Sequence, residues 1–148
     1  MSQFKFTSKA NEVISEARNI VYENNNIEIQ PVHVALALFQ DEQGLAYRLC
    51  RKMDTSRADI VTLLGQILAK CPRQDPSPDD PVPSGTLMRV LNKAKNIQKR
   101  QKDTFISVDT LLQALYENSA VANVLQQQGL GRKQVEEAIN VQIGRAHV

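Results

Sequence analysis

The sequence predicts an all-α domain made of two tandem four-helix repeats that are related by pseudo-twofold symmetry. Three observations support this prediction. Apolar residues recur at the spacing of one helix face, and no segment alternates like a half-buried strand. A proline-rich stretch divides the 148 residues into nearly equal halves, and these halves resemble each other.

The proline-rich stretch, residues 71–83, separates the two repeats. Five of the chain's six prolines fall within it, and proline removes a backbone donor and biases the preceding residue away from helix. We therefore expect an extended linker between a first repeat at residues 7–70 and a second at residues 84–143. Residues 144–148 are expected to form a tail, and residues 1–148 together to be a single domain.

The repeat is visible as pairs of similar residues at one constant separation. Each pair lies 77 positions apart, which is the separation between Thr7 and Ser84. A separation that holds across two helices and the loop between them indicates an internal duplication. Further pairs are Val13 with Val90, Ile29 with Ile106, residues 17–20 with 94–97 and residues 37–39 with 114–116.

Four helices are expected in the first repeat. Thr7 or Ser8 suits the N-cap of the first, because a hydroxyl can accept an otherwise unpaired backbone N–H. Pro31 suits the first position of the second helix, and Ser56 opens the fourth. The expected helices lie near residues 8–24, 31–39, 44–53 and 56–70.

The second repeat is expected to contain the same four helices. Ser107 is the expected cap of its second helix, whose first residue, Val108, takes the place of Pro31. Gly129 and Gly131 mark the last turn. The expected helices lie near residues 85–101, 108–117, 119–128 and 132–142.

Composition excludes several classes of protein. The formal net charge is only +2, whereas dedicated nucleic-acid binders carry a much larger basic excess. Two cysteines do not make a disulfide framework, which favours a reducing compartment. We expect a cytosolic or nuclear protein without a membrane segment, because no apolar run approaches the roughly 20 residues of a spanning helix.

No constellation of residues indicates catalysis or a metal site. A phosphate-binding G-x-x-x-x-G-K-[ST] loop is absent from the sequence. His33 and His147 are the only histidines, and their spacing from Cys50 and Cys71 does not match a zinc site. We expect no catalytic residue, metal or cofactor in this chain, with His33 in a structural role and Cys50 in the core.

Residues 89–102 form a basic run that contains six Lys or Arg residues and no acid. Such a run is typical of a solvated helix face, but it can also dock an acidic partner. Asp103 follows the run, and Asp109 falls in the first turn of the next helix. Asp109 is expected to complement the helix dipole and Asp103 to pair with a cation, or either residue positions a partner.

Two motifs resemble the Clp N-terminal domain family. They are QPVHVALALF at residues 30–39 and AKNIQKRQKDTFISVDTLLQAL at residues 94–115. The second is similar to ClpB-type heat-shock disaggregases, more to their eukaryotic cytosolic members than to the bacterial ones. The resemblance covers residues 3–143.

The resemblance implies an eight-helix domain that contacts unfolded or aggregated polypeptides before an ATPase ring threads them. ATP and Mg²⁺ then belong to modules absent from this chain, so the chain itself is expected to be no enzyme. The full-length protein is expected to form a homohexamer that works with a DnaK-type chaperone. This fragment alone is expected to be a monomer.

The resemblance also assigns roles to residues by matching positions. Family positions tied to chaperone activity correspond to Thr7, Asp103 and Asp109, and the last of these is often Glu in the family. Asp109 therefore keeps the charge on a shorter side chain.

The family's apolar peptide groove corresponds to Lys93, Ile97 and Thr110. Of these three residues, only Ile97 is apolar. We therefore expect a less apolar groove than in bacterial members, with Ile97 as its client contact.

Two other functions remain open at this point. One is an adaptor-docking or regulatory domain of a Clp ATPase, which binds one folded partner tightly. The other is a basic module that binds nucleic acid or acidic lipid through residues 89–102, in which case binding weakens with modest salt.

Overall fold

The computed structural model describes residues 3–143, and this part of the chain is helical without any strand. The all-α prediction is confirmed. The elements are α1 (Ser8–Glu23), α2 (Pro31–Gln40), α3 (Leu45–Lys52), α4 (Arg57–Leu68), α5 (Gly85–Arg100), α6 (Val108–Ala114), the 3₁₀ turn η1 (Leu115–Glu117), α7 (Ser119–Gln127) and α8 (Arg132–Ile143). Among the described residues, none of these helices has the length and apolar character that crossing a membrane requires.

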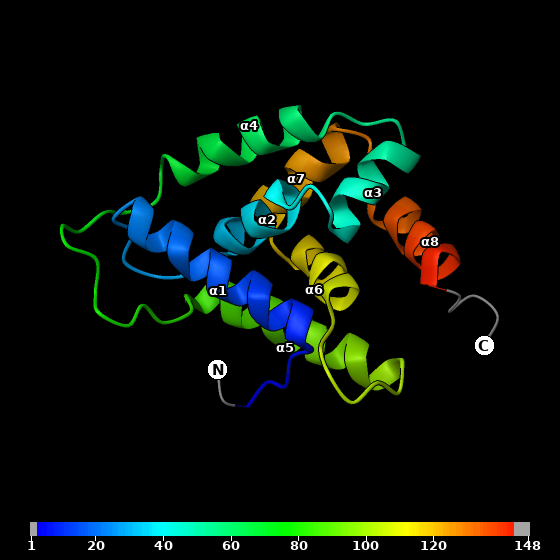
Figure 1. Cartoon of the computed structure of the whole chain (residues 1–148), viewed down its shortest axis with the longest axis horizontal. Coiled ribbons are helices and arrows are strands. Elements are labelled where there is room, and N and C mark those ends of the chain that lie inside the picture. The colour runs from blue at the N-terminus through cyan, green and yellow to red at the C-terminus, as the bar shows by residue number, and fades with distance from the viewer. Residues whose placement is uncertain (1–2, 144–148) are drawn as a thin grey trace.

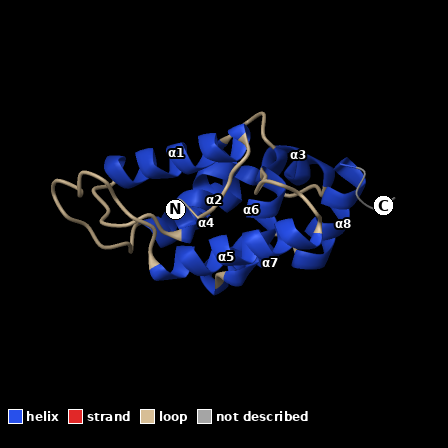
Figure 2. Cartoon of the chain, turned by 90° about the horizontal axis from the view of Figure 1, so that it is seen from below, coloured by secondary structure: helices blue, strands red, loops and turns tan. Residues whose placement is uncertain are grey.

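The helices form an elongated body in which α2 is the central element. Figure 1 shows the linker at one end and α3 and α8 at the other, while Figure 2 shows α1 and α5 on opposite sides of α2 and α6. Every residue of α2 from Pro31 to Phe39 is buried. The core is mainly Leu, Ile, Val and Ala, and Cys50 belongs to it at 2% exposure, as expected.

Two short backbone bridges interlock the repeats. Phe6 pairs with Ile106, and Ile29 pairs with Pro83, both in parallel. Ile106 follows Ile29 by 77 positions, and Pro83 follows Phe6 by the same number, so the two bridges are equivalent. The four bonds run from Thr7 N to Ile106 O (2.9 Å), Ile106 N to Lys5 O (2.7 Å), Ile29 N to Val82 O (3.0 Å) and Ser84 N to Ile29 O (2.9 Å).

The helix starts follow the expected capping chemistry in most places. The Thr7 hydroxyl accepts the N–H of Ala10 at 3.1 Å, and the Ser84 hydroxyl accepts that of Leu87 at 3.0 Å. The cap expected from Ser107 is wrong, because its hydroxyl donates to the Asp109 carboxylate and accepts no backbone N–H.

The helix expected at residues 108–117 is shorter than predicted. It tightens into a 3₁₀ turn at Leu115, where the N–H of Asn118 donates to the Leu115 carbonyl at 3.0 Å. The Asn118 side chain then caps α7 by accepting the N–H of Val121 at 3.1 Å. This polar cap ends one helix and begins the next within a single turn.

The linker is fixed to the first repeat through a buried histidine. His33 has no exposed surface, and its Nδ1 accepts the N–H of Gln30 at 2.8 Å. Its Nε2 therefore carries the proton and donates to Asn26 Oδ1 at 2.9 Å. Asn26 in turn donates to the carbonyl of Pro72 in the linker at 3.1 Å. His33 therefore has the expected structural role: it connects α2 to the linker through Asn26.

We predict that His33 makes the fold sensitive to mild acid. Burial lowers the pKa of His33 from 6.5 to about 4, so the unfolded chain binds the proton more readily between these values. The contribution of neutral His33 to the free energy of unfolding is complete above pH 6.5. It falls as the pH approaches 4, by about 3 kcal/mol in total. Urea unfolding of the parent chain across this range measures the loss.

A His33→Gln variant is the control, because its side chain stays neutral across this range. Its stability should depend on pH less steeply than the parent's. An identical pH dependence in the two chains contradicts the assignment to His33.

Candidate functional site

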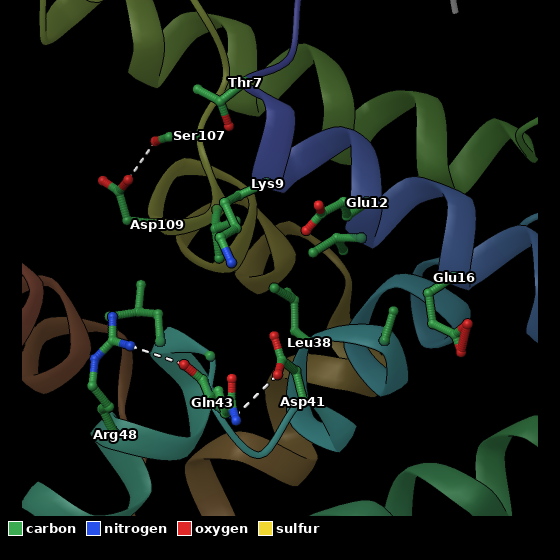
Figure 3. A pocket seen from close by; sticks show the side chains of 15 residues that line it. Thr7, Lys9, Glu12, Glu16, Leu38, Asp41, Gln43, Arg48, Ser107 and Asp109 are labelled. Carbon is green, nitrogen blue, oxygen red and sulfur yellow. Dashed lines mark hydrogen bonds between the residues drawn. The ribbon is translucent and has the colours of Figure 1, made fainter.

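A cleft of about 600 Å³ opens between α1, the turn from α2 to α3, and the start of α6 (Figure 3). Its apolar lining consists of Val13, Ala37, Leu38, Leu45 and Val108. Val13 and Val108 are half-buried, whereas the other three are at most 6% exposed. The cleft therefore has a firm apolar floor that belongs to the packed core.

The first wall combines the starts of α1 and α6, which belong to different repeats. The bridge between Phe6 and Ile106 holds these two helix starts side by side. Thr7 caps α1 at the edge of the cleft, and Ser107 lies beside it with its hydroxyl on the Asp109 carboxylate (Figure 3). Ser107 also shares a 2.9 Å hydrogen bond with Thr110, so the start of α6 is held by side chains.

The opposite wall is the turn from α2 to α3. The N–H of Gln43 donates to Asp41 Oδ1 at 3.0 Å, and Arg48 donates to the carbonyl of Gln43 at 3.1 Å (Figure 3). A Cβ on Gly44 would approach Asp41 Oδ2 to 2.8 Å, so glycine suits the close approach there. These contacts make the turn a defined wall.

The structure brings two of the predicted activity positions, Thr7 and Asp109, to the cleft. Asp103 lies elsewhere, in the loop between α5 and α6, where its N–H donates to the Gln98 carbonyl at 3.0 Å. The Gln98 side chain donates in return to the Asp103 carbonyl at 2.9 Å. The expected complementation of the α6 dipole by Asp109 fits its place in the first turn.

The residues predicted to form a peptide groove are mostly buried. Ile97 is 4% exposed and Thr110 has no exposed surface, whereas Lys93 is half-buried on α5. Ile97 borders a second hollow of about 270 Å³, together with Arg100 and Gln113. A peptide-binding role for Lys93, Ile97 and Thr110 stays a prediction.

The cleft was not predicted from the sequence. The cleft residues Val13 and Val108 are far apart in sequence, and only the interlocking of the repeats joins them. The constant separation between the repeats indicates that any contact between them occurs twice, but it does not say which helices meet.

The structure places the cysteines and the residue types that commonly bind metals. Within residues 3–143, no three His, Cys, Asp or Glu side chains come together as metal ligands. Burial raises the pKa of both Cys50 and Cys71, which keeps these free thiols protonated near neutral pH. His147 and the expected tail at 144–148 lie outside the described residues.

Comparison with known proteins gives one family. The family model described as the Clp repeat (R) N-terminal domain matches residues 5–128. Heat shock protein hsp98 of Neurospora crassa is 31% identical over 99% of the chain, and the chaperone protein ClpB of Pseudomonas putida is 32% identical over 97%. The chain spans only 18% and 17% of these relatives' lengths.

The fold comparison agrees with the sequence comparison. The crystal structure of the Hsp104 N-terminal domain from Candida albicans matches with a TM-score of 0.82 and 26% identity, over 93% of this chain and 91% of that one.

We predict that Thr7 acts on the cleft edge through its cap. Thr7→Ala removes the oxygen that accepts the Ala10 N–H and should lower stability by about 1 kcal/mol, whereas Thr7→Ser should keep most of it. Urea unfolding midpoints measure both effects. Ser84→Ala removes the equivalent cap of α5 away from the cleft and should lower stability by a similar amount, about 1 kcal/mol. Equal stability of Thr7→Ala and the parent contradicts the capping role.

Proposed function

The chain belongs to the Clp repeat N-terminal domain family, and we propose that it is the client-binding domain of a ClpB-type protein disaggregase. Its clients are unfolded or aggregated polypeptides. ATP hydrolysis with Mg²⁺, assembly of a hexameric ring and cooperation with a DnaK-type chaperone belong, in this proposal, to modules beyond this chain. The chain itself is proposed to be a monomer without catalytic activity.

The observation that carries the proposal is the apolar floor of the cleft. A volume of about 600 Å³ accommodates a few side chains of one short segment. The features that unfolded clients share are exposed apolar side chains, and a small floor contacts them without demanding one sequence. Such a floor therefore binds many clients weakly.

A structural relative supports peptide binding by this fold. A ClpV N-domain solved in complex with a VipB peptide has a TM-score of 0.70 to this chain and 12% identity. At 12% identity, this similarity shows only that the two domains share a fold. It supports the proposal because a domain of this architecture binds a peptide in that complex.

Burial favours the cleft over the predicted groove at α5 and α6. Val13 and Val108 present half-buried methyl groups to the cleft, whereas Ile97 and Thr110 lie almost entirely within the core. A client reaches the first pair without any separation of packed helices.

The proposed location is the cytosol or the nucleus. Cys50 and Cys71 are both free thiols, which suits a reducing compartment.

We predict that an unfolded, nearly neutral protein shifts the methyl NMR signals of the cleft. At physiological salt, the signals of Val13, Leu38, Leu45 and Val108 should move together as the client is added, because these methyl groups line one surface. A shift of the Ile97 methyl signal alone would assign the client to the groove on α5 instead. No movement at high client concentration would favour an adaptor-docking or regulatory domain.

A substitution pair makes the same test quantitative. Val13→Ser with Val108→Ser removes apolar contact area and should weaken client binding about fivefold, at roughly 25 cal/mol per Å² of lost contact. Val61→Ser is the control for lost core packing, because Val61 is also half-buried against the core but lies on α4 away from the cleft. Equal weakening by the control would mean that loss of stability, rather than the cleft, explains the effect.

A further inference from the structure

The rim of the cleft is acidic, although the chain as a whole is slightly basic. Six charged residues line the cleft. Glu12, Glu16 and Asp41 are exposed carboxylates, and Lys9 and Arg48 are exposed cations. The Asp109 carboxylate is 8% exposed and accepts the Ser107 hydroxyl, so it lies below this rim. The formal net charge of the whole chain is +2. The cleft therefore carries a local excess of negative charge over an apolar floor.

Glu12 and Glu16 form an unfavourable pair in the folded chain. They lie four positions apart on one face of α1, where two like charges destabilise a helix by a few tenths of a kcal/mol. Both are exposed, and within residues 3–143 neither forms an ion pair. Glu16 accepts a hydrogen bond from Asn19 at 3.2 Å, which leaves its charge uncompensated.

The fold itself does not require acids at these two positions. The residues 77 positions later are Arg89 and Lys93, on the equivalent helix of the second repeat. The helices α1 and α5 have the same length, and a hydroxyl side chain caps each of them. They nevertheless carry opposite charges at these two positions. Because the fold does not determine the charge at positions 12 and 16, that charge can contribute to binding a partner.

The geometry suits a side chain that is apolar along its length and positive at its end. Glu12 and Glu16 lie along one side of the cleft and Asp41 on the other, with Leu38 between them (Figure 3). The aliphatic stem of lysine or arginine packs on apolar surface while its cation stays near water. Carboxylates at the rim then meet the cation without full desolvation of either partner.

We infer that the cleft selects client segments in which lysine or arginine lies beside an apolar residue, and disfavours acidic segments. This inference rests on the proposed function, because it assumes that unfolded polypeptide enters the cleft. It adds the chemical class of segment that the domain captures first.

Three short peptides with the same apolar centre and flanking Lys, Gln or Glu residues test the inference on the 148-residue chain. By fluorescence anisotropy at low salt, the Lys peptide should bind about tenfold tighter than the Gln peptide, and the Glu peptide should bind most weakly. The preference should shrink to about twofold in 1 M salt, because the rim is exposed to water.

Charge reversal at the rim identifies the groups responsible. The double variant Glu12→Lys with Glu16→Lys should bind the Glu peptide tighter than the Lys peptide, with affinity for the Gln peptide unchanged. Glu23→Lys with Glu117→Lys is the matched control, because it changes the net charge equally at two exposed acids that do not line the cleft. It should leave the order of the three peptides as in the parent chain.

The possible failures are distinguishable. Equal affinity of the parent chain for the three peptides overturns the inference and leaves client binding intact. A control double variant, Glu23→Lys with Glu117→Lys, that changes the order as much as the cleft variant also overturns it, because overall charge would then be the cause. If no peptide and no unfolded protein moves the cleft signals, the proposed function fails together with the inference.

Discussion

The interlocking of the repeats by two backbone bridges is the constraint on which the rest of the structure depends. The segment before the first helix of each repeat pairs with the segment before the second helix of the other repeat, at Phe6 with Ile106 and at Pro83 with Ile29. Buried backbone groups must be paired, and these bridges pair them across the pseudo-twofold axis. The cleft exists because one of the bridges sets the start of α6 against the start of α1.

The two repeats use the same architecture with different chemistry at equivalent positions. Gln30 and His33 are bonded across the first turn of α2, and the residues 77 positions later, Ser107 and Thr110, are bonded across the first turn of α6. The imidazole has a second nitrogen, which it uses to hold Asn26 and through it the linker. The Ser107 hydroxyl instead donates to the Asp109 carboxylate at the cleft.

Local patterns predicted the helices well, because periodicity, capping residues and prolines act within a few positions. The bounds of α1 and α5 were predicted to within one residue, as was the cap at Thr7, and Ser84 caps α5 at the equivalent position of the second repeat. The role of Ser107 was not, because a carboxylate two residues away competes with the backbone for its hydroxyl. The meeting of Val13 and Val108 in one cleft depends on how the repeats pack, which no local pattern contains.

The cleft combines a small apolar floor with an exposed charged rim, and this combination has a kinetic consequence. Exposed charges raise the rate of encounter more than they raise affinity, because water screens them once the partner is bound. A floor formed by residues such as Val13 and Leu38 contributes only modest apolar contact, so dissociation remains fast. A domain that captures segments quickly and releases them quickly can pass a chain onward, whereas a deep pocket would retain it. The small floor therefore fits the proposed function, in which this domain passes clients to another module.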